Sequence, residues 1–229
     1  MKVIDIKRQP LDLVLDDFCI CETCHIVDRY MMRSEAGNDC PKCGEPRPYG
    51  RAYFHSSVRS LINLMQEFYH ARYKIGDEAL NIELQDAHNS ELAVVIFFAS
   101  LREVLLVNFI KELLNARNGP DATYKHQLSD SRTYSHKMTK LFPNLVGVQW
   151  NKAIKEISKP GKIDYEKLDC FVRRIAEARN SFLHDGIKYA IEKDMPGACL
   201  ENISPLLNLY VALHNTYVFP IYEQKRKPA

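Results

Sequence analysis

We begin with residues 177–186, which read Glu-Ala-Arg-Asn-Ser-Phe-Leu-His-Asp-Gly. Apolar side chains lead into this stretch at steps of three and four from Leu168 onward. That spacing predicts an amphipathic helix with one buried side. Asp164 is placed to cap its first turn, and Gly186 follows its last periodic residue as a stop. The chain is therefore expected to be organised around a helix that starts after Asp164, ends near Gly186 and packs on a helical body.

Two side chains near the end of this helix suit phosphodiester chemistry. Arg179 offers a charged planar fork that holds two phosphate oxygens. His184 supplies an imidazole, and histidine as a residue type, with a model-peptide pKa of about 6.5, can take and return a proton near neutral pH. Five residues on an ideal helix leave the two about 140° apart. They converge only if the helix ends or bends at His184, or if Arg179 reaches around. The alternative is a helix end with a cation favoured by the dipole and a capping histidine.

The surroundings of the pair carry a family resemblance. Asn180 follows the arginine, Leu183 precedes the histidine, Gly186 comes soon after, and the host segment is helical. This pattern resembles the R-x4-6-H motif of the HEPN superfamily, the all-helical domains of many prokaryotic RNase toxins and antiviral RNases. The resemblance covers the motif, an acidic residue on an early helix and the order of helices.

The resemblance implies a function and partners. It implies a metal-independent endoribonuclease, of toxin or anti-phage defence type, that leaves 2′,3′-cyclic phosphate ends on RNA. His184 would be the general base and acid, Arg179 the phosphate clamp, and Asn180 would orient the phosphate or His184. In the family two motifs commonly meet across a homodimer, which would relax the angular problem. An antitoxin or regulatory protein is a further expected partner.

One carboxylate in an apolar helix is a candidate partner of the motif. The helix predicted from Ser90 to about Asn115 carries an apolar stripe in which Glu103 is the only charge. A buried carboxylate is costly unless it is paired, and Arg179 or His184 could pair it. HEPN domains often place an acidic residue there. Alternatively, Glu103 lies at the edge of the stripe and reaches water. The helix is apolar on nearly all sides, so it is central or covered by a second subunit, and we expect a homodimer.

Two matched cysteine pairs predict a metal site. Cys21 and Cys24 form one Cys-x-x-Cys pair, and Cys40 and Cys43 form another some fifteen residues later. This is the spacing of a four-cysteine zinc ribbon, whose Zn²⁺ is structural because four cysteine ligands leave no open position. Cys19 and His25 lie close enough in the sequence to replace one ligand.

These signals together predict a mainly α protein: a helical, HEPN-like bundle preceded by a small zinc-ribbon β unit. The zinc ribbon is expected over residues 1–50 and the helical domain over residues 51–229, with a linker from Pro46 to Tyr53. A first helix should run from Ser56 or Ser57 to about Ile75. A last helix should run from Glu201 to Tyr222, with a proline near its first turn.

Composition and charge limit the cellular location and the binding partners that we expect for the protein. The net charge is only +2, which excludes a large basic field and disfavours a zinc-ribbon factor that binds duplex DNA. The sequence lacks a secretory signal, and its longest apolar run is too short for a membrane span. Grouped cysteines point to metal rather than disulfides, so a cytoplasmic protein is expected. Cys170 and Cys199 are interpreted as buried apolar fillers.

Two interpretations of the helical domain stay open. Basic and aromatic residues alternate over residues 121–145, a pattern that can hold single-stranded RNA but is also typical of a solvated helix face. The whole protein can likewise be an RNA-cleaving enzyme or a non-catalytic scaffold that binds RNA or protein and carries a structural zinc ribbon.

Overall fold

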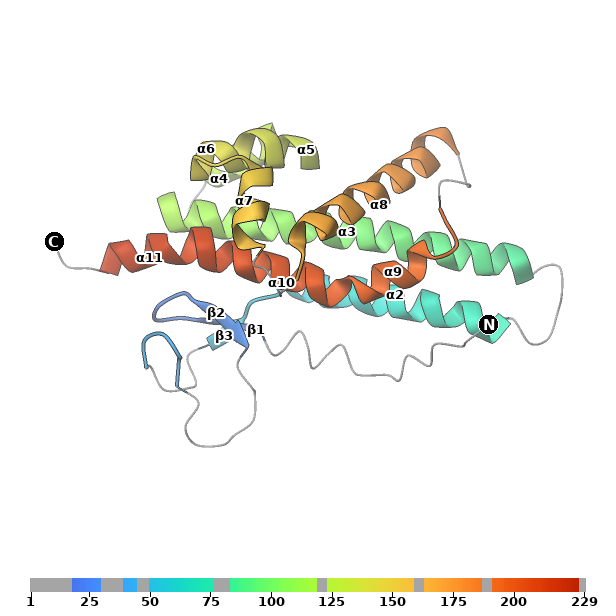
Figure 1. The fold of residues 1–229 in the computed structure, drawn as a ribbon, viewed down its shortest axis with the longest axis horizontal. Helices are drawn as coiled ribbons and strands as arrows, with labels where there is room; N and C mark the ends of the chain where they lie inside the picture. The colour runs from blue at the N-terminus through green and yellow to red at the C-terminus, as the bar shows by residue number, and fades with distance from the viewer. Residues whose placement is uncertain are drawn as a thin grey trace.

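The computed structural model describes residues 18–29, 39–44, 50–75, 83–118, 123–158, 163–186 and 191–226. Helices make up most of these segments, and a small three-stranded sheet lies near the N-terminus of the chain (Figure 1). The prediction of a mainly α protein with a small β unit is confirmed.

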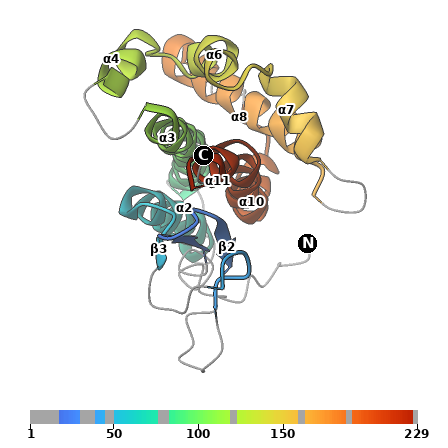
Figure 2. The ribbon, with the colours of Figure 1, turned by 90° about the vertical axis from the view of Figure 1, so that its left-hand side faces the viewer.

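Three rows of helices run side by side in the body of the molecule (Figures 1 and 2). They are α2 (Ser56–Ile75), α3 (Glu83–Asn118) and a C-terminal row of α10 (Ile203–Leu213), the π-helical turn η3 (His214–Val218) and α11 (Phe219–Arg226). The short α9 (Met195–Glu201) packs on α2 and α3. Helix α3 is central, with Phe98, Leu106 and Phe109 fully buried.

Helix α3 is also the only helix in the described segments that is long and apolar enough to cross a membrane by length and composition, which corrects the expectation that the longest apolar run is too short for a span. Its segment Asn89–Arg117 has a mean hydropathy of 2.0 in its most apolar window, and 56% of that window is buried inside the protein. The same properties belong to the core helix of a soluble protein, and this is the position that α3 occupies (Figure 2).

A second layer covers one side of this bundle. It contains α4 (Thr123–Asp130), α5 (Tyr134–His136), the π-helical turn η1 (Lys137–Leu141), α6 (Phe142–Val146), α7 (Trp150–Ile157) and α8 (Tyr165–Asp185). Helix α8 crosses α3 obliquely (Figure 1). Its predicted ends are confirmed: Asp164 Oδ1 accepts a hydrogen bond from the Lys167 N–H at 3.0 Å, and Gly186 has a left-handed φ of 66°.

The sheet is antiparallel, with β1 (Phe18–Cys21) between β2 (Val27–Arg29) and β3 (Gly50–Ala52). Its apolar residues are not a separate core, because Phe18, Ile20 and Val27 belong to the same buried cluster as the helices. Strand β3 lies within the stretch that was expected to be a linker, and it pairs with β1.

Three local predictions were wrong. Helix α3 begins at Glu83, ahead of the predicted start at Ser90. The predicted last helix is divided, with a break at Asn202 and a π-helical turn at η3, where Asn and His side chains turn towards the sheet. Cys170 is exposed rather than buried, because it lies on the outer side of α8, whereas Cys199 is buried as predicted.

Candidate functional site

Four cysteines form a compact cluster beside the sheet. The sulfur atoms of Cys21, Cys24, Cys40 and Cys43 all lie within 4.8 Å of one another. Cys21 Sγ is 3.8 Å from Cys43 Sγ, and Cys24 Sγ is 3.6 Å from Cys40 Sγ. A tetrahedron of thiolates about 2.3 Å from a central ion has edges of about 3.8 Å. The four sulfurs are thus spaced to hold one metal ion.

The two cysteine pairs have the same backbone turn. The His25 N–H donates to the Cys21 carbonyl at 2.8 Å, and the Gly44 N–H donates to the Cys40 carbonyl at 2.8 Å. In each turn the residue after the second cysteine has a positive φ, 62° at His25 and 70° at Gly44. Glycine adopts this conformation without steric cost, whereas histidine pays for it.

His25 compensates for its backbone conformation through contacts with the C-terminal row. Its ring stacks on Tyr222 with ring centres 3.7 Å apart, and its carbonyl oxygen lies 2.9 Å from His214 Nε2. Neither His25 nor Cys19 belongs to the sulfur cluster. The two alternative ligands left open by the sequence therefore lie outside the group of four that is spaced for a metal.

Burial opposes the thiolate form of Cys24 when no cation is bound. Cys21, Cys24 and Cys40 are buried, and burial raises the pKa of the Cys24 thiol well above its ordinary value. Contacts with the other three cysteines raise that pKa further, while a hydrogen bond from the Ile26 backbone lowers it. A bound cation would reverse this effect, since a coordinating thiol is deprotonated by the metal.

The cysteine cluster is fixed to the C-terminal row of helices. The Val27 N–H donates to Asn215 Oδ1 at 2.9 Å, and Asn215 Nδ2 donates to the Val27 carbonyl at 2.6 Å. The amide of Asn215 thus pairs with both backbone groups of a strand residue, as a neighbouring strand would. Phe219 packs directly on the cysteines, and Lys42 forms an ion pair with Glu223 at 3.4 Å. Sequence patterns gave no sign of this contact, because Asn215 and Phe219 read as ordinary positions of a helix.

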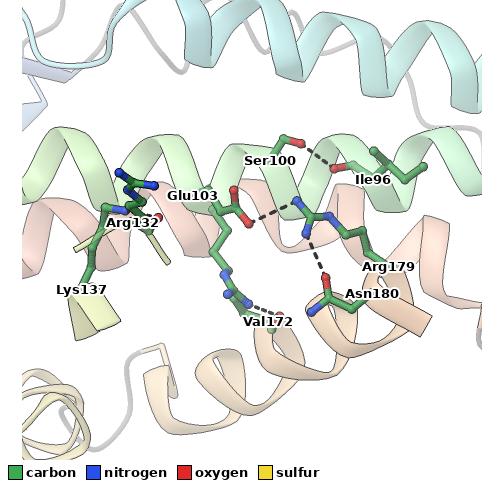
Figure 3. Close-up of polar contacts among 9 residues, drawn as sticks. Ile96, Ser100, Glu103, Arg132, Lys137, Val172, Arg179 and Asn180 are labelled. Atoms are coloured by element: carbon green, nitrogen blue, oxygen red, sulfur yellow. Dashed lines mark hydrogen bonds and ion pairs between the residues drawn. The ribbon is translucent and has the colours of Figure 1, made fainter. Parts of the chain in front are cut away.

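The predicted acidic partner of the motif is in place. Arg179 Nη2 on α8 lies 3.3 Å from Glu103 Oε1 on α3, and Arg179 Nη1 donates to Asn180 Oδ1 at 2.9 Å (Figure 3). The side chains of Arg179 and Glu103 are 24% and 44% exposed, so the pair lies at the surface of the α3–α8 contact. Glu103 therefore pairs with Arg179 and also reaches water, so each of the two alternative interpretations of the sequence describes part of its environment.

A second cation lies near Glu103 (Figure 3). Lys137, at the start of η1, is buried, and its Nζ donates to the Arg132 carbonyl at 2.9 Å. Burial lowers the pKa of Lys137, and the negative charge of Glu103 partly opposes this. Glu103 thus lies in the field of Arg179 on one side and of Lys137 on the other.

The structure does not bring Arg179 and His184 together within one chain. His184 is exposed in the last turn of α8, and no hydrogen bond or ion pair joins it to another residue of the described segments. Helix α8 continues to Asp185 and does not bend at His184, so the angular separation of the two side chains remains. Beside His184, Leu183 is 51% exposed, the most exposed large apolar side chain of the described residues.

Comparison with known proteins does not assign a family. No protein-family model matches the chain, and no curated protein or solved structure matches it.

Proposed function

We propose that this protein is a cytoplasmic, metal-independent endoribonuclease of the HEPN type with a structural zinc ribbon, and that two copies assemble to complete the cutting site. The resemblance rests on the motif Arg179–Asn180–His184 and on Glu103. The observation that carries the proposal is that Glu103 and Asn180 hold the Arg179 guanidinium at the surface of the α3–α8 contact, while His184 stays exposed on the same helix.

A second copy of the chain would bring an arginine and a histidine together although Arg179 and His184 are separated within one chain. In a twofold dimer each copy presents the same surface to the other, so a histidine of one chain can reach the arginine of its partner. The exposed end of α8 suits such a contact, because Leu183 offers apolar surface directly beside His184. Each dimer would then contain two equivalent composite sites.

The proposed reaction is an attack of the ribose 2′-hydroxyl oxygen on the adjacent phosphorus. His184 takes the proton of the 2′-hydroxyl, and the bond between phosphorus and the 5′ oxygen breaks. A proton is then returned to the leaving 5′ oxygen, which leaves a 2′,3′-cyclic phosphate and a 5′-hydroxyl. Arg179 stabilises the negative charge that gathers on the five-coordinate phosphorus.

We assign zinc to the four cysteines because a full tetrahedral set of thiolates is typical of structural zinc. The ion would neutralise the buried thiolates and fix the two backbone turns. The ion would take no part in the proposed reaction, because four cysteine ligands leave no position for a substrate or water.

RNA digestion in the presence of a chelator of Mg²⁺ tests this function. The wild type should cleave single-stranded RNA, with retained zinc verified on the same sample. His184→Ala and Arg179→Ala should each lower the cleavage rate at least a hundredfold, because each removes a group that acts only in the transition state. Cleavage at the wild-type rate by both variants would refute the assignment.

A second function has one observation in its favour. Both terminal nitrogens of Arg179 already have protein partners, which is also what a purely structural arginine would show. In that case the protein is a non-catalytic scaffold that binds RNA or another protein through its helical body. It would bind RNA without turnover, and His184→Ala would leave the binding unchanged.

A further inference from the structure

Arg102, a buried arginine next to Glu103 in the sequence, has few hydrogen-bond partners for its guanidinium and no carboxylate as a counter-ion among the described residues. Arg102 is only 6% exposed, and within the described residues the single hydrogen bond of its side chain runs from Nη1 to the Val172 carbonyl at 2.9 Å. Its guanidinium stacks on the Tyr134 ring at 3.4 Å, and its buried Nε has no partner there. A guanidinium has five N–H donors, so most of its capacity is unused.

The nearby carboxylates are committed to other groups. Asp169 accepts from Trp150 Nε1 at 3.1 Å and from Arg173 Nε at 2.9 Å. Glu103 pairs with Arg179. Among the described residues no carboxylate forms an ion pair with Arg102. A buried cation without a counter-ion is unfavourable, and an anionic ligand would offset that cost.

A groove of about 480 Å³ opens at this arginine. This size falls in the range of small-molecule sites. Trp150, Tyr134, Met138 and Ala176 supply apolar surface, and amide and hydroxyl groups supply hydrogen-bonding partners at the rim: Ser135, Thr139, Gln149, Asn151 and Asn180. Two further charged residues line the groove, Arg173, which is bound to Asp169, and Glu177, which is exposed.

We propose that this groove binds the phosphate group of a nucleotide, with Arg102 as the principal anion contact. The guanidinium matches a phosphate, which it can hold through two parallel hydrogen bonds. The apolar walls and the amide rim suit the sugar and base that follow the phosphate. The nucleotide can be free or part of a single RNA strand, and Asn180 places the groove beside Arg179. The assignment does not depend on the proposed nuclease activity.

Ligand binding in this groove can be followed by tryptophan fluorescence, because Trp150 lines the groove and is the only tryptophan of the chain. The purified full-length protein is titrated with inorganic phosphate, adenosine 5′-monophosphate and a 2′-O-methyl oligoadenylate that cannot be cleaved. Because adenine absorbs light and distorts the emission signal, the affinities are also measured independently by calorimetry on the same samples. We expect the two nucleotide probes to change the Trp150 emission and to bind more tightly than phosphate.

Two exposed residues of the rim provide a matched pair of near-isosteric variants. Gln149→Glu adds a negative charge to the groove, and Glu177→Gln removes one. We expect the first to weaken nucleotide binding about three- to tenfold and the second to strengthen it by a similar factor. Neither change removes a buried contact, so the fold should persist. Arg102→Met, checked by circular dichroism, should weaken binding more than tenfold.

The relative affinities of the probes distinguish the two possible sources of the nucleotide. Tighter binding of the oligonucleotide identifies an RNA strand as the ligand, and tighter binding of the monophosphate identifies a free nucleotide. The assignment is overturned if neither nucleotide binds, if inorganic phosphate binds as well as they do, or if both rim variants leave the affinity unchanged. His184→Ala should not alter this binding, so a failed nuclease assay and a failed groove are distinguishable.

Discussion

Arg179 Nη2 lies 3.3 Å from Glu103 Oε1, so one ion pair joins the end of α8 to the central helix α3. Both side chains are partly exposed, at 24% and 44%, and water therefore screens the attraction. Ion pairs of this kind contribute at most about 1 kcal/mol to stability. We infer that the pair positions the guanidinium more than it stabilises the fold.

Glu103→Gln tests this positioning role. The variant should lose less than about 1 kcal/mol in the free energy of unfolding, measured by urea denaturation. RNA cleavage should fall about tenfold or more, because Arg179 is no longer held in one orientation. Glu67→Gln on the exposed side of α2 is the control and should change neither quantity. A large loss of stability with unchanged cleavage would show a structural pair.

Loss of one cysteine ligand should remove the metal. Cys24→Ser should lower the zinc content, measured by mass spectrometry, from one ion per chain to well below one. It should also lower the melting temperature, because the free energy of metal binding is part of the folding free energy. Cys170→Ser is the matched control, since that thiol is exposed and lies outside the cluster. Equal zinc content in both variants would contradict the assignment.

Acid should release the metal as well. Without an ion, burial raises the pKa of Cys24, so the thiol keeps its proton at neutral pH and the metal must displace it. Binding therefore releases protons, and affinity rises with pH and falls as pH is lowered. Zinc release followed with a chromophoric chelator should show this direction. An affinity independent of pH would exclude thiolate ligands.

The two hydrogen bonds between Asn215 and Val27 should contribute measurably to the free energy of unfolding, because they are partly buried. Asn215→Ala leaves the N–H and the carbonyl of a 1% exposed residue without their side-chain partners. We expect a loss of about 2–3 kcal/mol in the free energy of unfolding. Asn208→Ala is the control, because the Asn208 amide donates only within α10, to the carbonyl and hydroxyl oxygens of Ser204, and the variant should lose less than about 1 kcal/mol.

Local signals in the sequence were enough to predict the ends of α8 and the cluster of four cysteines. The Asp164 cap, the left-handed Gly186 and the spacing of Cys21, Cys24, Cys40 and Cys43 all depend on residues close together in the chain. These features need no knowledge of how distant segments pack. Glu103 was expected to pair with Arg179 or His184, or to reach water instead, and only the packing of α8 on α3 selects Arg179, which is 76 residues away.

Distant contacts had no such signal. Val27 and Asn215 are 188 residues apart, and nothing in a helical pattern shows that an asparagine will pair with a strand. The π-helical turn that holds Asn215 also divides a helix that reads as continuous. Arg102 stands out in the sequence only as a charge beside Glu103 in an apolar run. The groove at Arg102 could not be predicted, because residues of α5, η1, α7 and α8 form it together.

The buried carboxylate Asp169 should support the α7–α8 contact through two separable bonds. It accepts from Trp150 Nε1 and pairs with Arg173, whose side chain is 52% exposed. Asp169→Asn keeps an acceptor for the indole and should lose about 1 kcal/mol, since water takes over Arg173. Asp169→Leu leaves the indole N–H unpaired and should lose about 2–3 kcal/mol. Equal losses, measured by urea denaturation, would show that the indole bond contributes nothing.

A composite site across a dimer makes a prediction that a site within one chain does not. Arg179→Ala and His184→Ala should each be inactive alone. When the two variants are mixed, unfolded and refolded together, half of the dimers should contain one chain of each kind. In such a dimer the intact arginine of one chain meets the intact histidine of the other, and the second site lacks both groups.

The mixture should therefore recover about a quarter of the wild-type cleavage rate per chain. The double variant Arg179→Ala/His184→Ala mixed with wild type is the control, because those mixed dimers contain no complete composite site. This control mixture should show about a quarter of the wild-type rate per chain, because random pairing leaves about a quarter of the dimers wild type in both chains and only these have complete sites. If the two single variants stay inactive when mixed while this control is active, each chain must assemble its own site, and α8 would have to rearrange to bring Arg179 and His184 together.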